Sequence, residues 1–178
     1  LDKLVKFLIE KKYKIYSTGG TSKYLKDINV PHIEISKYTK QREILDGRVK
    51  TLHPKIFGGL LGINNNKHKK ALKKERIVEF DILVVNLYPF ENTINNTKDK
   101  SKIIEMIDIG GHSLIRAAVK NYEKIATIID PNDYESLIKN FPIKKQQKNN
   151  NAIKAINHIT EYDLNISNWF VNKNTKKF

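Results

Sequence analysis

Apolar positions along the chain recur first with the period of a helix and then in short runs typical of buried strands. Val5 is followed by Leu8 and Ile9 on one helical face, which predicts an amphipathic helix over residues 1–13. A short strand is expected at residues 14–17, followed by a glycine turn and a second helix. Strand, glycine turn and helix in this order are typical of parallel α/β proteins.

The rest of the pattern predicts further strands and helices in alternation. The expected strands are residues 32–35, 81–87 and 125–129, and the expected helices are 24–29, 67–75, 101–107, 112–121, 131–140 and a last one after the polar stretch 144–151. Residues 82–85 are continuously apolar, which favours a strand in the middle of a sheet and buried on both faces. Pro54 is expected to stop any helix before it. We therefore expect an α/β fold of three layers, with a mainly parallel sheet and helices on both faces.

Composition allows one folded domain and excludes several classes of site. The 178 residues are 39% hydrophobic, which suffices for a core, and contain no cysteine for a disulfide or thiolate metal site. The few histidines do not have metal-ligand spacing. Neither a membrane span nor a signal peptide is expected from the apolar runs, so we expect a cytoplasmic protein without a metal.

The formal net charge of +14 raises the question of a nucleic-acid partner. Lysines are scattered along the chain among asparagine runs rather than massed with aromatic residues, which favours compositional drift on solvated surfaces. We therefore expect no nucleic acid as partner. A basic surface still attracts anionic small molecules.

Two basic or glycine-rich segments are candidates for anion binding. Residues 17–21 combine hydroxyls and glycines ahead of a helix, which suits a phosphate, although an ordinary structural turn has the same sequence. In residues 46–54, Arg48 and Lys50 alternate and would point the same way in an extended stretch, so that both could meet one anion. The alternative is two solvated basic side chains.

Two further segments place polar groups near expected strand or helix ends. Asn86 and Tyr88 follow the most apolar strand, where Tyr88 could face a ligand or cap the core. Asp108 precedes a Gly-Gly helix start, where a helix cap is the commonest role for an aspartate. Lys120 lies further along that helix and, taken alone, would face solvent.

Taken together, the segments resemble the inosine monophosphate cyclohydrolase domain of bifunctional aminoimidazole carboxamide ribonucleotide transformylase/cyclohydrolases. The resemblance is carried by STGGT (17–21), DGRVKTLHPKIFGGLL (46–61), VVNLYPF (84–90), IDIGG (107–111), LIRAAVKN (114–121) and EYDLNISNWF (161–170). It implies a methylglyoxal-synthase-like domain over residues 1–170 that lacks its first strand. Residues 171–178 would then be a tail or the start of a linker to an absent transformylase domain.

The resemblance also implies an activity, its ligands and a site. The family closes the ring of 5-formamidoimidazole-4-carboxamide ribonucleotide (FAICAR) to inosine monophosphate (IMP) with loss of water, as a dimer and without metal or organic cofactor. The implied substrate-binding residues are Thr18, Gly19, Gly20 and Thr21 for the phosphate and Arg48, Thr51, Asn86, Ile109 and Gly110 for the rest of the nucleotide. The implied catalytic residues are Lys50, Tyr88, Asp108 and Lys120. We hypothesise that Lys50 and Tyr88 stabilise the oxyanion, while Asp108 and Lys120 move protons.

Other proteins with the same fold are the main alternatives. A methylglyoxal-synthase-type lyase and the effector domain of carbamoyl phosphate synthetase share the glycine turn, but DGRVKTLHP and NLYPF favour the cyclohydrolase. A non-catalytic nucleotide- or phosphate-binding domain, or one kept only for dimerisation, is a further alternative. His112 is assigned no role.

Overall fold

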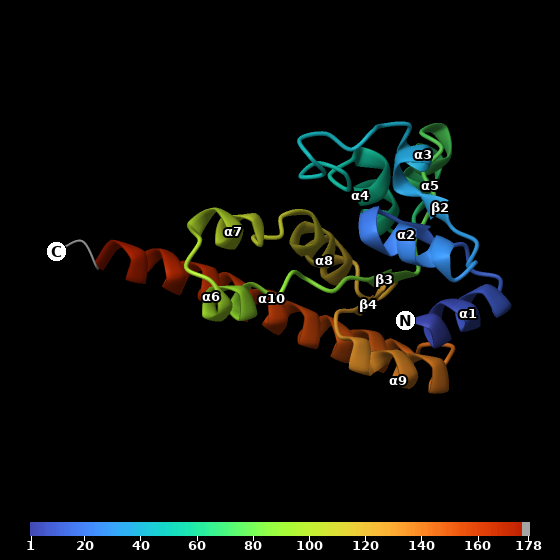
Figure 1. Ribbon diagram of the computed structural model, residues 1–178. Coiled ribbons are helices and arrows are strands. Elements are labelled where there is room, and N and C mark those ends of the chain that lie inside the picture. Colours follow the sequence, from blue (N-terminus) through green and yellow to red (C-terminus); the bar gives the residue numbers. More distant parts are fainter. Residues whose placement is uncertain (176–178) are drawn as a thin grey trace.

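The computed structural model describes residues 1–175, which form short strands separated by helices (Figure 1). The strands are β1 (Tyr16–Ser17), β2 (Ile33–Glu34), β3 (Ile82–Val84) and β4 (Ala126–Ile128). The helices are α1 (Asp2–Glu10), α2 (Gly19–Asp27), α3 (Ile35–Thr39), α4 (Pro54–Leu61), α5 (Asn66–Lys74), α6 (Phe90–Asn96), α7 (Lys100–Glu105), α8 (Gly110–Lys120), the 3₁₀ turn η1 (Pro131–Asp133), α9 (Tyr134–Lys139) and α10 (Lys145–Thr175). No helix in this part of the chain is both long and apolar enough to cross a membrane.

The strands form two parallel pairs with helices on both faces. Strand β1 pairs with β2, and β3 pairs with β4. Because side chains alternate along a strand, Ile82 and Val84 pack toward α1 and α9, whereas Leu83 and Val85 pack toward α4, α8 and α10. The prediction of a three-layer α/β fold with parallel strands is therefore confirmed.

Strand β3 is less enclosed than the sequence predicted. All three residues of β4 are buried, but those of β3 are only partly buried. Within residues 1–175, β3 pairs with β4 and β1 pairs with β2, and the two pairs are separate sheets. The prediction that this apolar run lies in the middle of a sheet is therefore wrong for the described residues, since one edge of β3 has no partner strand there.

The helix α8 lies at the centre of the packing. Ile115 and Ala118 are fully buried, and α8 contacts α4 on one side and α10 on another. Ala117 and Ala118 are small enough for α4 to approach closely. Figure 1 shows α10 running along one side of the molecule and extending past α8 beside α6.

Two helix starts differ from the prediction. No helix runs into Pro54, as expected, but Pro54 is itself the first residue of α4, a helix that the sequence pattern did not predict. Proline is tolerated in the first turn, where its missing N–H has no intrahelical acceptor. His53 caps this start through Nδ1, which accepts a hydrogen bond from the Lys55 amide at 3.1 Å. Helix α10 begins within the stretch 144–151, which was expected to be a polar connection.

The expected tail is also partly helical. Helix α10 continues through Thr175, so residues 171–175 belong to it, and residues 176–178 lie outside the described residues. Besides α4, the sequence pattern also missed α3 and α6, which are short and follow directly on β2 and on the segment after β3. Short helices of this kind depend on tertiary packing, as at Phe90, of which only 1% is exposed.

We expect Gly59→Ala to lower the free energy of unfolding by about 1–3 kcal/mol. A Cβ on Gly59 would lie 2.3 Å from the Val78 carbonyl oxygen, which belongs to the backbone and cannot rotate away. The control is Gly20→Ala in α2, where a Cβ meets no atom within 4 Å and the helix propensity of alanine stabilises by up to about 1 kcal/mol. Urea unfolding followed by circular dichroism measures both, and equal effects would contradict the packing explanation.

Candidate functional site

The turn between β1 and α2 presents backbone N–H groups to solvent. Thr18 is extended and is the N-cap residue of α2, while Gly19 begins the helix with a φ of +48°, which a side chain disfavours. The N–H groups of Gly19, Gly20 and Thr21 lie in the first turn, where they have no intrahelical acceptor. The positive end of the helix dipole lies there too, so this turn can hold a phosphate group.

The neighbouring residues Lys50 and Thr51 lie beside two different predicted segments, Lys50 beside the glycine turn and Thr51 beside the start of α8. The Lys50 Nζ lies 3.6 Å from the position that a Cβ on Gly19 would take. The Thr51 Oγ1 lies 2.8 Å from the corresponding position on Gly110, so a side chain on Gly110 would displace this hydroxyl. The structure therefore brings an ammonium group and a hydroxyl from one loop to both predicted binding segments.

Asp108 caps α8. Its Oδ1 accepts a hydrogen bond from the Gly111 amide at 2.7 Å, which fixes the carboxylate at the helix N-terminus. Gly111 is also held close to Val85, just after β3, because a Cβ on Gly111 would lie 2.9 Å from Val85 Cγ1. The capping role considered for Asp108 is therefore present, and the carboxylate lies beside Gly110, which Thr51 contacts.

Arg48 does not point toward the anion site with Lys50. Residues 44–49 form a turn closed by a bridge between Ile44 and Val49, so the extended backbone assumed for the alternation is absent here. Arg48 instead forms a two-point pair with Glu105, in which Nε donates to Oε1 at 3.3 Å and Nη2 donates to Oε2. The hydrogen bond from Arg48 lowers the pKa of Glu105, and the pair ties this turn to α7.

The two predicted site residues after β3 have different surroundings: Asn86 is hydrogen-bonded to α9, and Tyr88 is exposed. The Asn86 amide donates from Nδ2 to the Tyr134 hydroxyl at 3.0 Å, on the side of the strand away from Gly111. Tyr88 is 47% exposed and therefore does not cap the core, a role that belongs to Phe90. The Tyr88 side chain is accessible to a ligand.

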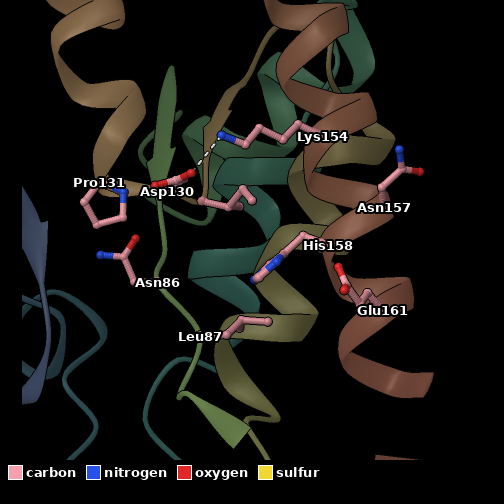
Figure 2. A pocket seen from close by; sticks show the side chains of 9 residues that line it. Asn86, Leu87, Asp130, Pro131, Lys154, Asn157, His158 and Glu161 are labelled. Atoms are coloured by element: carbon pink, nitrogen blue, oxygen red, sulfur yellow. Dashed lines mark hydrogen bonds and ion pairs between the residues drawn. The ribbon is translucent and has the colours of Figure 1, made fainter. Parts of the chain in front are cut away.

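A hollow of about 520 Å³ lies between the ends of β3 and β4 and helix α10 (Figure 2). It is lined by Asn86, Leu87, Ile129, Asp130, Pro131, Lys154, Asn157, His158 and Glu161. The Lys154 ammonium reaches across from α10 to Asp130 at 2.9 Å and to Asp133 at 2.7 Å. The backbone amide of Asn132, together with Lys154, lowers the pKa of Asp130. Asn86 is the one predicted site residue in this lining.

Lys120 lies at the opposite end of α8 from Asp108. Asp108 precedes α8 and Lys120 is its last residue, so the ten residue steps from Gly110 to Lys120 lie between them. At 1.5 Å per residue this amounts to about 15 Å. The geometry within one chain does not support a direct proton transfer between Asp108 and Lys120, and the role of Lys120 stays a prediction. Ile109 is 57% exposed beside Gly110, at the open side of the site.

Sequence reasoning missed the contacts that hold the site loops in place. Glu105 is 57 residues from Arg48, so no spacing could reveal that pair. Tyr162 of α10 accepts a hydrogen bond from the Asp108 amide at 2.8 Å and donates one to the Met106 carbonyl at 2.7 Å. The signal available for Tyr162 was its place in the segment 161–170, which carried part of the resemblance.

The parallel strand pairs and the helices on both faces define an α/β domain, with a glycine turn at a helix N-terminus and Lys50 nearby. A model of the MGS-like domain matches residues 1–113, and a model of the AICARFT/IMPCHase bienzyme matches residues 118–178. The chain belongs to the family of MGS-like domains.

The chain is similar to curated proteins named bifunctional purine biosynthesis protein PurH. It is 44% identical over 169 residues to the protein of Prochlorococcus marinus (strain MIT 9515), which covers 92% of this chain and 33% of that protein. It is 46% identical over 181 residues to the protein of Thermoanaerobacter sp. (strain X514), which covers 97% and 35%. The chain therefore spans about a third of the length of these relatives.

The fold is also similar to a solved structure. The crystal structure of ForH aligns with a TM-score of 0.83, 24% sequence identity, and coverage of 94% of this chain and 91% of that one. At this identity the similarity concerns the fold alone.

We expect Asp108→Ala to lower the free energy of unfolding by about 1 kcal/mol, because the Gly111 amide loses its capping acceptor. In Asp108→Asn the side-chain oxygen can still accept this hydrogen bond, so stability should stay close to that of the unchanged chain. Thermal and urea unfolding measure both variants. Equal destabilisation by the two substitutions would show that the negative charge, rather than the cap, stabilises this helix end.

Proposed function

We propose that the chain is the inosine monophosphate cyclohydrolase part of a bifunctional transformylase/cyclohydrolase and closes FAICAR to IMP with loss of water. The observation that carries the proposal is the position of the Lys50 Nζ beside Gly19, together with that of the Thr51 Oγ1 beside Gly110, which is two residues after Asp108. Their proximity supports a site in which the glycine turn, the Lys50 ammonium, the Thr51 hydroxyl and the Asp108 carboxylate act on one ligand. The named relatives and the bienzyme model over residues 118–178 support the same assignment.

The reaction needs help at two points. The carboxamide nitrogen attacks the formyl carbon and must lose a proton, while the formyl oxygen gains negative charge and then leaves as water. We assign the phosphate to the turn Thr18–Thr21 and the oxyanion to Lys50 and Tyr88, which can donate hydrogen bonds. Asp108 is assigned to proton transfer, and its fixed position at the N-terminus of α8 sets the direction of the carboxylate.

A further strand is part of this proposal. Tyr16 in β1 and Leu83 in β3 both pack against the same core cluster around Ile56 and Leu114, although the two strand pairs are separate. A parallel strand between β1 and β3 would join the pairs into one sheet, and its carboxyl end would lie beside the glycine turn. We propose that residues preceding Leu1 supply it, and that the chain works as a homodimer.

We expect conversion of FAICAR to IMP by a version of the chain extended at the N-terminus by this strand, with little or none by residues 1–178. The added strand completes the wall of the nucleotide site, and ultraviolet absorbance follows the ring closure. Conversion by the extended form alone would support both the assignment and the added strand. If the extended form folds but neither converts FAICAR nor binds IMP, a non-catalytic domain of the same fold is the better account.

In the extended form, we expect Lys50→Ala to lower kcat by about 10²- to 10³-fold, the effect of removing one oxyanion donor. The matched control is Lys139→Ala in α9, which removes the same charge from an exposed position outside the site. Steady-state kinetics at several salt concentrations separate local contact from net charge. Equal losses in the two variants would mean that the basic surface, and not Lys50, assists the reaction.

A further inference from the structure

The segment 161–170 carries part of the family resemblance but supplies none of the site residues assigned above. It lies in α10, and Tyr162 within it is buried, with 7% of the residue exposed. We propose that Tyr162 is a positioning residue, which holds the loop between α7 and α8 and thereby fixes the Asp108 carboxylate in the site. This inference rests on the function proposed for Asp108.

The Tyr162 hydroxyl bonds to the backbone on both sides of Ile107. It accepts from the Asp108 amide at 2.8 Å and donates to the carbonyl of Met106, the C-cap residue of α7, at 2.7 Å. One hydroxyl therefore satisfies a donor and an acceptor in the connection from α7 to α8. Since the Asp108 side chain is held by Gly111, both ends of the Asp108 residue are fixed, its backbone by Tyr162 and its carboxylate by α8.

The surroundings of Tyr162 keep this hydroxyl in place. Its ring meets Phe90 edge-on, with centroids 6.1 Å apart, and belongs to a cluster that includes Ile103 of α7. Burial raises the pKa of Tyr162, so the hydroxyl keeps the proton that it donates to Met106. The next residue, Asp163, contacts His112 of α8 at 3.1 Å, which gives α10 a second hold close to the start of α8.

Two roles for Tyr162 can be separated because phenylalanine has the same ring. If Tyr162 only fills the core, Tyr162→Phe changes nothing at Asp108, since the contacts with Phe90 and Ile103 persist. If the hydroxyl positions the loop, Tyr162→Phe frees the Asp108 amide and the Met106 carbonyl while the fold remains.

The test compares Tyr162→Phe with Tyr38→Phe. The Tyr38 hydroxyl also accepts a backbone hydrogen bond of 2.8 Å, from the Val78 amide, in a part of the molecule that the proposed site does not use. Amide hydrogen exchange by NMR in residues 1–178 should be about tenfold faster at Asp108 and Gly111 in Tyr162→Phe, because each lost hydrogen bond weakens protection modestly. Tyr38→Phe should leave these two amides unchanged.

Kinetics of the extended form give the second readout. We expect Tyr162→Phe to lower kcat about 10- to 100-fold with KM within about twofold, because a displaced carboxylate affects the reaction more than binding. Tyr38→Phe should keep both constants. Unchanged exchange at Asp108, or faster exchange with an unchanged kcat, would overturn the positioning role. If the extended form without substitutions has no cyclohydrolase activity, the proposed function fails, and exchange alone decides whether Tyr162 orders the loop.

Discussion

The burial of α8 between α4 and α10 is the constraint on which the site depends. Ile115 and Ala118 are fully buried, so the helix cannot shift without opening the core on either side. Its N-terminus therefore has a fixed position. There the Thr51 hydroxyl lies beside Gly110, and the Gly111 amide donates a hydrogen bond to the Asp108 carboxylate. The buried helix α8 thus gives defined positions to the exposed loops that carry Thr51 and Asp108.

Net charge and local geometry would contribute differently to anion binding by this chain. The net charge of +14 attracts anions to the whole surface but does not choose where they bind. Under the proposed function, the binding position is set by Lys50 beside the glycine turn. The carboxylates of Glu105 and Asp108 are each bonded within the chain, Glu105 to Arg48 and Asp108 to the Gly111 amide.

Periodicity and composition predicted the fold class and the order of most elements, because these depend on local pattern. Contacts between distant segments could not be predicted: the Arg48–Glu105 pair and the Tyr162 hydrogen bonds join residues 54 or more positions apart. The separation of Asp108 from Lys120 was within reach, since the helix expected at 112–121 already put them at opposite ends. The alternation of Arg48 and Lys50 misled because a turn replaced the extended backbone.

The continuity of α8 has a consequence for how such proteins can be recombined. The two family models meet between residues 113 and 118, a boundary that lies inside this helix rather than in a linker. Helix α10, from the second model, packs on α8 and β4. A chimera joined at that boundary would therefore have to match both halves of a buried helix and the packing of α10 against it.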